Sequence, residues 1–296
     1  MFPEIEAVAL NIDELLSSTN ESDFVGYGVD LLVESASYLT ICCSIYPDER
    51  GWTLPQAIIG GNGVRLHKLI QGYLDATCQH RREISEILSR LIFETSTNIV
   101  YLVNFTTDEL IKSYLDYSLK YERKLKIQIE KRIRVRGVTL PIEDRMLASI
   151  GSLADASGID LNNPPLNKRN WGDKDLFQKA ELVGWGDAYL GVFAGMSGAV
   201  HGNWGDIATH HLERFDGSGF YKPCFDWSMP RPQSPYAIAR MIVCVCDSML
   251  AILGGSEVQE YFAGKLDDII ERLEKLTELH ELFLARMDFA TDEESP

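Results

Sequence analysis

The feature that most constrains this chain is a run of small residues spaced three and four apart between Gly184 and Trp204. On a helix, this spacing places the small side chains in one stripe. The stripe consists of Ala188, Gly191, Gly195, Gly198 and Gly202. Each interior glycine costs a helix about 1 kcal/mol relative to alanine, so such a stripe is typical of a segment that another backbone or a ligand approaches closely. We expect a helix over 184–202 that packs tightly or borders a cavity.

Polar residues lie beside this stripe, namely Ser197 and His201 one helical turn apart. A hydrolase triad draws its members from different elements, and no G-x-S-x-G motif surrounds Ser197, so a serine nucleophile is not expected. We predict that His201 is a general acid/base or a phosphate-facing group, with Tyr189 and Trp204 shaping a cavity beside it. The alternative is a helix-terminal histidine that is hydrogen-bonded to its own last turn.

Helical periodicity dominates the remainder of the chain. We expect an all-α protein that forms a single globular bundle of about eight to ten helices, with a small β-hairpin near 215–225. The expected divisions are N-terminal helices over 1–59, a helical core with the candidate site over 60–253, and an acidic C-terminal helix over 254–296.

Two kinds of segment can be assigned from the pattern alone. The periodicity predicts helices over these ranges: 3–18, 23–46, 64–79, 81–104, 107–135, 142–156, 173–182, 236–253 and 256–288. A loop is expected over 47–63, which holds two prolines and a glycine cluster at 60, 61 and 63. That cluster lacks the G-K-[ST] ending of a phosphate-binding loop, so we expect it to cap a helix.

The predicted helix over 81–104 carries a line of polar residues on an otherwise apolar surface. The line consists of Arg90, Glu94, Asn98 and Tyr101. Buried polar groups need partners, because an unpaired buried charge costs several kcal/mol. The line is therefore either a structural polar network, with Arg90 and Glu94 paired along the helix, or one wall of a polar pocket.

Charge is segregated along the chain, whose formal net charge is −16. A uniformly acidic surface would repel nucleic acid, but residues 120–136 hold eight basic residues, including Arg132 and Arg134, against two acidic ones. Residues 254–296 hold twelve acidic residues against four basic ones. We expect the basic helix to meet an acidic face of this chain or of a partner copy, or else to receive an RNA backbone. The acidic C-terminal helix is the candidate surface for a partner protein or for self-association.

The cysteines and histidines suggest neither a disulfide framework nor a metal site. None of the six cysteines forms a C-x-x-C pair, which favours buried thiols in a reducing compartment. The acidic N-terminus is unlike a signal peptide, and the apolar run at 188–200 is too short for a bilayer, so we expect a cytoplasmic protein without a membrane. One His/Asp/Glu group lacks any recognised metal-ligand spacing, so no metal and no cofactor are expected. Its members are His201, Asp206, His210, His211 and Glu213.

Two of these patterns together resemble a known family. They are Arg90-(x3)-Glu94-(x3)-Asn98-(x2)-Tyr101 and, after Trp171, Tyr189-(x7)-Ser197-(x3)-His201-Gly202. Over roughly residues 60–240 the chain resembles a family of uncharacterised bacterial all-helical proteins, described only as a domain of unknown function.

Those proteins are similar in outline to HEPN-type helical domains, many of which are RNA-cleaving effectors in toxin–antitoxin and antiphage systems. The resemblance implies a metal-independent ribonuclease in which His201 is the general acid/base and Arg90 stabilises charge on the phosphate. Glu94 and Ser197 would orient these two groups, and Asn98 and Tyr101 would line the pocket.

The chain departs from the HEPN signature, which is an arginine followed after four to six residues by a histidine. None of the six histidines has such an arginine before it. Arg90 and Glu94 would therefore have to meet His201 across two helices. The other expectation is a non-catalytic helical interaction or sensor module that oligomerises or docks a partner protein.

Overall fold

The computed structural model describes residues 2–46, 49–162, 169–194, 197–214 and 219–293. These residues hold thirteen α-helices, three short helices of other types and one two-stranded sheet. The elements are α1 (Ile12–Ser17), α2 (Glu21–Cys42), α3 (Leu54–Cys78), α4 (Arg82–Phe105), α5 (Asp108–Ser118), α6 (Lys120–Arg136), α7 (Pro141–Ser157), the 3₁₀ helix η1 (Trp171–Asp173), α8 (Leu176–Leu182), α9 (Gly186–Ala188), the π-helix η2 (Tyr189–Ala194), α10 (Ser197–His201), α11 (Trp204–Asp206), the π-helix η3 (Ile207–His211), β1 (Leu212–Arg214), β2 (Tyr221–Pro223), α12 (Gln233–Leu253) and α13 (Ser256–Glu293).

The predicted all-α fold with a small hairpin is confirmed. Strands β1 and β2 pair antiparallel, with Leu212 opposite Pro223 and Arg214 opposite Tyr221. The number of helices exceeds the expected eight to ten, because three helices of three to five residues lie between residues 186 and 206.

The structure divides the chain into two compact units. Unit 1 comprises residues 1–104 and 180–296, and unit 2 comprises residues 105–179. Each unit buries apolar side chains of its own, so each has a separate core. The boundaries expected at 59/60 and 253/254 stay predictions.

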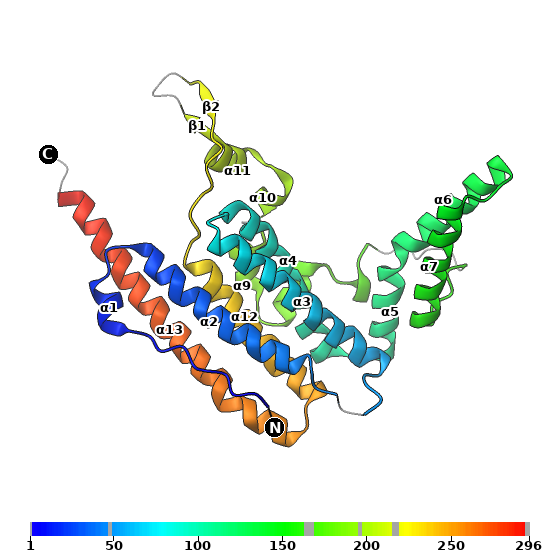
Figure 1. Cartoon of the computed structure of the whole chain (residues 1–296), viewed down its shortest axis with the longest axis horizontal. Coiled ribbons are helices and arrows are strands. Elements are labelled where there is room, and N and C mark those ends of the chain that lie inside the picture. Colours follow the sequence, from blue (N-terminus) through cyan, green and yellow to red (C-terminus); the bar gives the residue numbers. More distant parts are fainter. Residues whose placement is uncertain (1, 47–48, 163–168, 195–196, 215–218, 294–296) are drawn as a thin grey trace. The chain divides into compact units, whose positions relative to one another are not determined.

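The centre of unit 1 is a layer of three helices, α2, α12 and α13, which run side by side (Figure 1). Helix α12 is long and apolar enough to span a membrane by length and composition, and it lies buried in this layer. It contacts both α2 and α13, and α3 packs against α2 and α12. Gly28 of α2 allows the closest approach, because a Cβ atom there would lie 2.6 Å from Cε1 of Tyr236 on α12.

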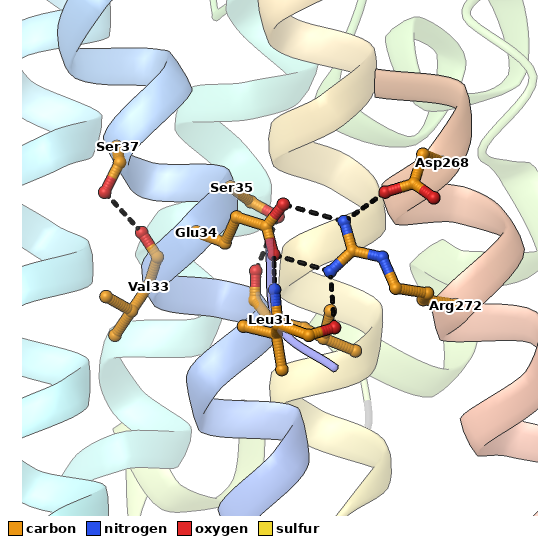
Figure 2. Close-up of polar contacts among 8 residues, drawn as sticks. Leu31, Val33, Glu34, Ser35, Ser37, Asp268 and Arg272 are labelled. Atoms are coloured by element: carbon orange, nitrogen blue, oxygen red, sulfur yellow. Dashed lines mark hydrogen bonds and ion pairs between the residues drawn. The ribbon is translucent and has the colours of Figure 1, made fainter. Parts of the chain in front are cut away.

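The N-terminal segment is extended up to Asn11, whereas a helix was predicted over 3–18. This prediction is wrong for residues 3–11, because long-range contacts hold the backbone. The Val8 N–H donates to the buried Glu34 carboxylate on α2, and Arg272 of α13 donates both to the Val8 carbonyl and to Glu34. Figure 2 shows the Arg272 guanidinium between the carboxylates of Glu34 and Asp268.

The predicted loop over 47–63 is wrong at its C-terminal end, where α3 begins at Leu54. Pro55 occupies the first turn of the helix, where a missing N–H is tolerated. Gly60 and Gly63 lie inside the helix rather than capping it. A Cβ atom at Gly60 would lie 2.6 Å from the Trp52 ring, and one at Gly63 would lie 2.8 Å from Sγ of Cys43. Tertiary packing therefore outweighs the low helix propensity of glycine here.

Unit 2 consists of α5, α6 and α7 with the segment up to Lys179. The single helix predicted over 107–135 is divided into α5 and α6 at Leu119, which is buried with Ile129 and Ile150 in the core of this unit. Thr107 caps α5 as the sequence predicts, since its side chain accepts from the Leu110 N–H. Arg132 and Arg134 of the basic helix α6 are exposed.

Candidate functional site

A cavity in unit 1 has a volume of about 920 Å³. Its walls come from α3, α4, the segment 198–210 and the start of α12. The ionisable and hydroxyl groups that reach it include Tyr73, Arg82, Glu86, Asp206, His210 and Arg231. A concave site with a few converging polar groups is the usual form of a ligand-binding or active site.

His210 is the best-positioned histidine in this cavity. Its Nδ1 lies 2.8 Å from Oγ of Ser228 and 3.5 Å from Oε1 of Glu83, and only 8% of its side chain is exposed. Glu83 also accepts the backbone N–H of Ser228 at 3.1 Å. Three segments that are distant in sequence thus converge on one imidazole: the first turn of α4, the end of η3 and the irregular chain before α12.

Glu83 is held in its ionised form. Burial alone would raise the pKa of this carboxyl group, but hydrogen bonds from its own backbone N–H and from Ser228, together with His210, lower the pKa overall. A carboxylate beside Nδ1 favours the tautomer with a proton on Nδ1, which leaves Nε2 as the basic nitrogen. Within the described part of the chain, Nε2 of His210 has no hydrogen-bond partner. This arrangement is suited to general acid/base chemistry.

Other groups in the cavity supply positive charge and a proton donor. Arg82 forms an ion pair with Glu86 on the same helix at 2.6 Å, and Arg231, which precedes α12, also lines the cavity. Burial raises the pKa of Tyr73 to about 12, so its hydroxyl stays protonated at neutral pH. In the ranges that the structure describes, no group of three or more His, Cys, Asp or Glu could hold a metal ion.

The structure places α4 against the segment where the glycine-rich helix was expected. The Arg90 guanidinium lies 4.2 Å from the centre of the Phe193 ring, and Phe193 packs on Phe93 and Tyr189. Arg90 and Tyr189 of the predicted site therefore meet the same aromatic cluster. Asn98 is half-buried and Tyr101 is buried.

His201 and Glu94 are both exposed. Among the described residues, neither takes part in a hydrogen bond, an ion pair or a ring contact. Ser197 begins α10, but its side chain lies outside the part of the structure that can be described. Trp204 is 61% exposed and packs edge-on against Tyr221 at 5.6 Å. The catalytic role of His201 with Arg90, Glu94 and Ser197 stays a prediction.

The prediction of one α-helix over 184–202 is wrong for residues 189–194, which form the π-helix η2 after the three-residue helix α9. Helix α10 covers residues 197–201, and residues 195–196 lie outside the described residues. Several glycines in one segment weaken the regular α-helical ladder, and π-helical turns often occur at functional sites. Gly198 and Gly191, from the predicted small-residue stripe, do line the cavity.

Four residues at this site are not predicted from the sequence: Glu83, Ser228, Tyr73 and Arg231. No local spacing connects them, since Ser228 is 145 residues from Glu83. His210 was considered only within a metal-binding group. The one sequence signal for this site is Glu83, an acidic residue in the first turn of a predicted helix. An acidic residue at that position more often stabilises the helix N-terminus than forms part of a site.

Residues 56–219 match the family model described as Family of unknown function (DUF5677). This match covers more than half of the chain. The chain belongs to DUF5677. The predicted membership of a domain-of-unknown-function family is thereby confirmed. The part matched to DUF5677 contains Glu83, His201 and His210, whereas Ser228 and Arg231 follow it. No curated protein and no solved structure matches the chain.

Proposed function

We propose that this chain is a HEPN-like ribonuclease that cleaves RNA without a metal ion, and that the reaction takes place in the cavity around His210. The observation that carries the proposal is the buried His210 imidazole, whose Nδ1 is held by Ser228 and the ionised Glu83. A role in defence, of the toxin–antitoxin or antiphage kind, belongs to the same proposal and derives from the HEPN resemblance.

The cavity residues can be assigned roles in RNA transesterification. Nε2 of His210 takes the proton of a ribose 2′-hydroxyl, whose oxygen attacks the adjacent phosphorus. The bond to the 5′-oxygen breaks, and this leaving oxygen takes up a proton, with the protonated Tyr73 hydroxyl as one donor in the cavity. The products are a 2′,3′-cyclic phosphate and a 5′-hydroxyl. Arg82 and Arg231 stabilise the negative charge that develops on the phosphate.

His210, rather than His201, is the proposed general base for a physical reason. A base works efficiently when a second group fixes its tautomer and orientation. His210 has such partners, whereas His201 is exposed and makes no described polar contact. The basic helix α6, with exposed Arg132 and Arg134, is the candidate contact for the RNA backbone in unit 2.

The test compares RNA cleavage by the full-length protein and three single variants, in the presence of EDTA. We expect His210→Ala to lower the cleavage rate about 100-fold or more, and His201→Ala to leave it nearly unchanged. Glu83→Gln should lower the rate at neutral pH and change the acidic limb of the pH profile, because it removes the charge beside Nδ1. Thermal melts of each variant check that the fold is retained.

The opposite ranking, with activity lost in His201→Ala and retained in His210→Ala, would place the reaction at the centre predicted from sequence. No cleavage of varied RNA substrates by the wild type would reject the ribonuclease proposal.

A second candidate function is an interaction module, which the exposed charges of α6 favour. Arg132 and Arg134 on α6 carry positive charge, and the acidic α13 offers a complementary surface on a partner copy or partner protein. Light scattering over a range of salt concentrations tests this candidate, because attraction between exposed charges weakens as salt is added. Oligomers that dissociate with salt support it, and a monomer at every salt concentration contradicts it.

A further inference from the structure

Four exposed aromatic side chains lie on α11, on β2 and on the chain that follows β2, and they are called here the aromatic surface. Its members are Trp204, Tyr221, Phe225 and Trp227. Phe225 is 89% exposed and Trp204 is 61% exposed. A soluble chain rarely leaves several large rings in water on neighbouring segments without a binding role. The rings lie on the hairpin strand β2, on α11 and on the irregular chain that leads to α12.

Two of the segments that carry the aromatic surface border the cavity or contact a residue that lines it. Asn203 and Gly205, on either side of Trp204, both line the cavity. Ser228, the residue after Trp227, contacts His210 through its hydroxyl. Trp204 and Trp227 are therefore adjacent in sequence to residues that line the cavity or contact His210.

The surroundings of these rings favour a nucleic-acid strand. The Arg81 guanidinium lies 5.8 Å from the centre of the Trp227 ring, so a positive charge stands beside a stacking face. Charged residues such as Lys222 and Asp226 alternate with the rings, unlike the continuous aliphatic face of a protein interface. Unpaired bases stack on aromatic rings, whereas bases inside a duplex are covered on both faces.

We propose that the aromatic surface stacks the unpaired bases of single-stranded RNA and guides the strand into the cavity. This inference rests on the proposed function and names its substrate class: RNA with at least a few unpaired nucleotides beside the cleaved bond. Double-stranded RNA is excluded because its bases are not available for stacking.

The experiment measures binding separately from cleavage, with full-length protein carrying His210→Ala. Fluorescence anisotropy follows a labelled single-stranded RNA of about twelve nucleotides, and the same strand in a blunt duplex. We expect the single strand to bind more tightly than the duplex. Adding Phe225→Ala or Trp204→Ala should raise its Kd about tenfold each, a typical effect for one stacked base. Phe225 is highly exposed, so its replacement should leave the fold intact.

A matched control is Tyr46→Ala, because Tyr46 is 60% exposed but lies between α2 and α3, outside the aromatic surface. The Kd of this variant for the single-stranded RNA should not change. Equal Kd values for all variants, or tighter binding of the duplex, would overturn the inference. The inference would also be overturned if the aromatic variants altered only self-association or binding to neutral phosphatidylcholine vesicles.

The outcomes separate this inference from the proposed function. Single-strand binding that depends on the rings, without cleavage by the wild type, keeps the inference and rejects the ribonuclease. Cleavage with an unchanged kcat/KM in the aromatic variants keeps the ribonuclease and rejects the inference.

Discussion

Glu34 is a buried carboxylate whose charge is balanced within a small network. Arg272 donates to both of its oxygens, at 2.6 and 2.7 Å, and the Val8 N–H donates to one of them at 2.9 Å. Removing one partner of a buried ion pair is costly, because the other charge is left without compensation. The same guanidinium also contacts Asp268, whose side chain is 53% exposed. Arg272 therefore has one buried carboxylate partner, Glu34, and one exposed carboxylate partner, Asp268.

We predict that Glu34→Gln lowers the free energy of unfolding by about 3 kcal/mol, while Asp268→Asn lowers it by at most about 1 kcal/mol. Urea denaturation followed by circular dichroism measures both values. Amide exchange should also become faster at Val8 in the first variant, since its N–H loses a charged acceptor. Equal losses in the two variants would contradict the role given to burial.

At the scale of elements, the packing of α2 on α12 depends on Gly28, and Gly26 on the same helix provides a comparison. A Cβ atom at Gly28 would lie 2.6 and 2.8 Å from two carbons of the Tyr236 ring. That ring cannot move freely, since its hydroxyl donates to the Phe24 carbonyl at 3.1 Å. A Cβ atom at Gly26, two residues earlier, would meet nothing within 4 Å.

Opposite effects are expected from the same substitution at these two positions. Gly28→Ala should destabilise the protein by about 1–3 kcal/mol, because it forces α2 and α12 apart. Gly26→Ala should stabilise it by up to about 1 kcal/mol, because alanine has the higher helix propensity. Chemical denaturation of the two variants provides the measurement. If both substitutions destabilise the protein, the higher helix propensity of alanine does not raise the stability of α2.

At the scale of the whole molecule, two cores can be weakened independently. Ile150 is 6% exposed in the core of unit 2, where it packs with Leu119 and Ile129. Truncating a buried isoleucine to alanine costs about 2–5 kcal/mol. Because unit 1 has its own buried helices, this loss should be confined to unit 2.

We expect Ile150→Ala to speed amide hydrogen exchange throughout residues 105–179, while protection of α2 and α12 stays at its wild-type level. Leu31→Ala in α2, where Leu31 is fully buried, is the reciprocal variant. It should reduce protection in unit 1. Uniform loss of protection in both variants would mean that the two units unfold as one cooperative body.

Some of this structure follows from local sequence. The apolar periodicity predicts α4, α12 and α13, and the Asp-Gly-Ser-Gly run at 216–219 predicts a hairpin, although β1 begins at Leu212, earlier than expected. Thr107 is recognisable as a helix cap because its acceptor and the N–H it serves are only three residues apart. Such features depend on backbone preferences and contacts within one or two turns.

Other features depend on residues that are remote in sequence. The N-terminal segment has a helical pattern, yet contacts of Val8 with Glu34 and Arg272 hold it extended. The glycines of α3 indicate a loop, yet close packing against Trp52 and Cys43 accommodates them in a helix. In both places tertiary contacts exceed the local preference, which amounts to about 1 kcal/mol per residue or less.

By itself, the sequence determined that the chain is all-helical, where most of the long helices lie, and that one short hairpin interrupts them. Only the tertiary structure decided that Glu83 and Ser228 contact His210, which lines a cavity. The physical reason is distance along the chain. Local patterns encode the conformation of neighbouring residues, whereas the convergence of side chains 145 residues apart is set by how the helices pack.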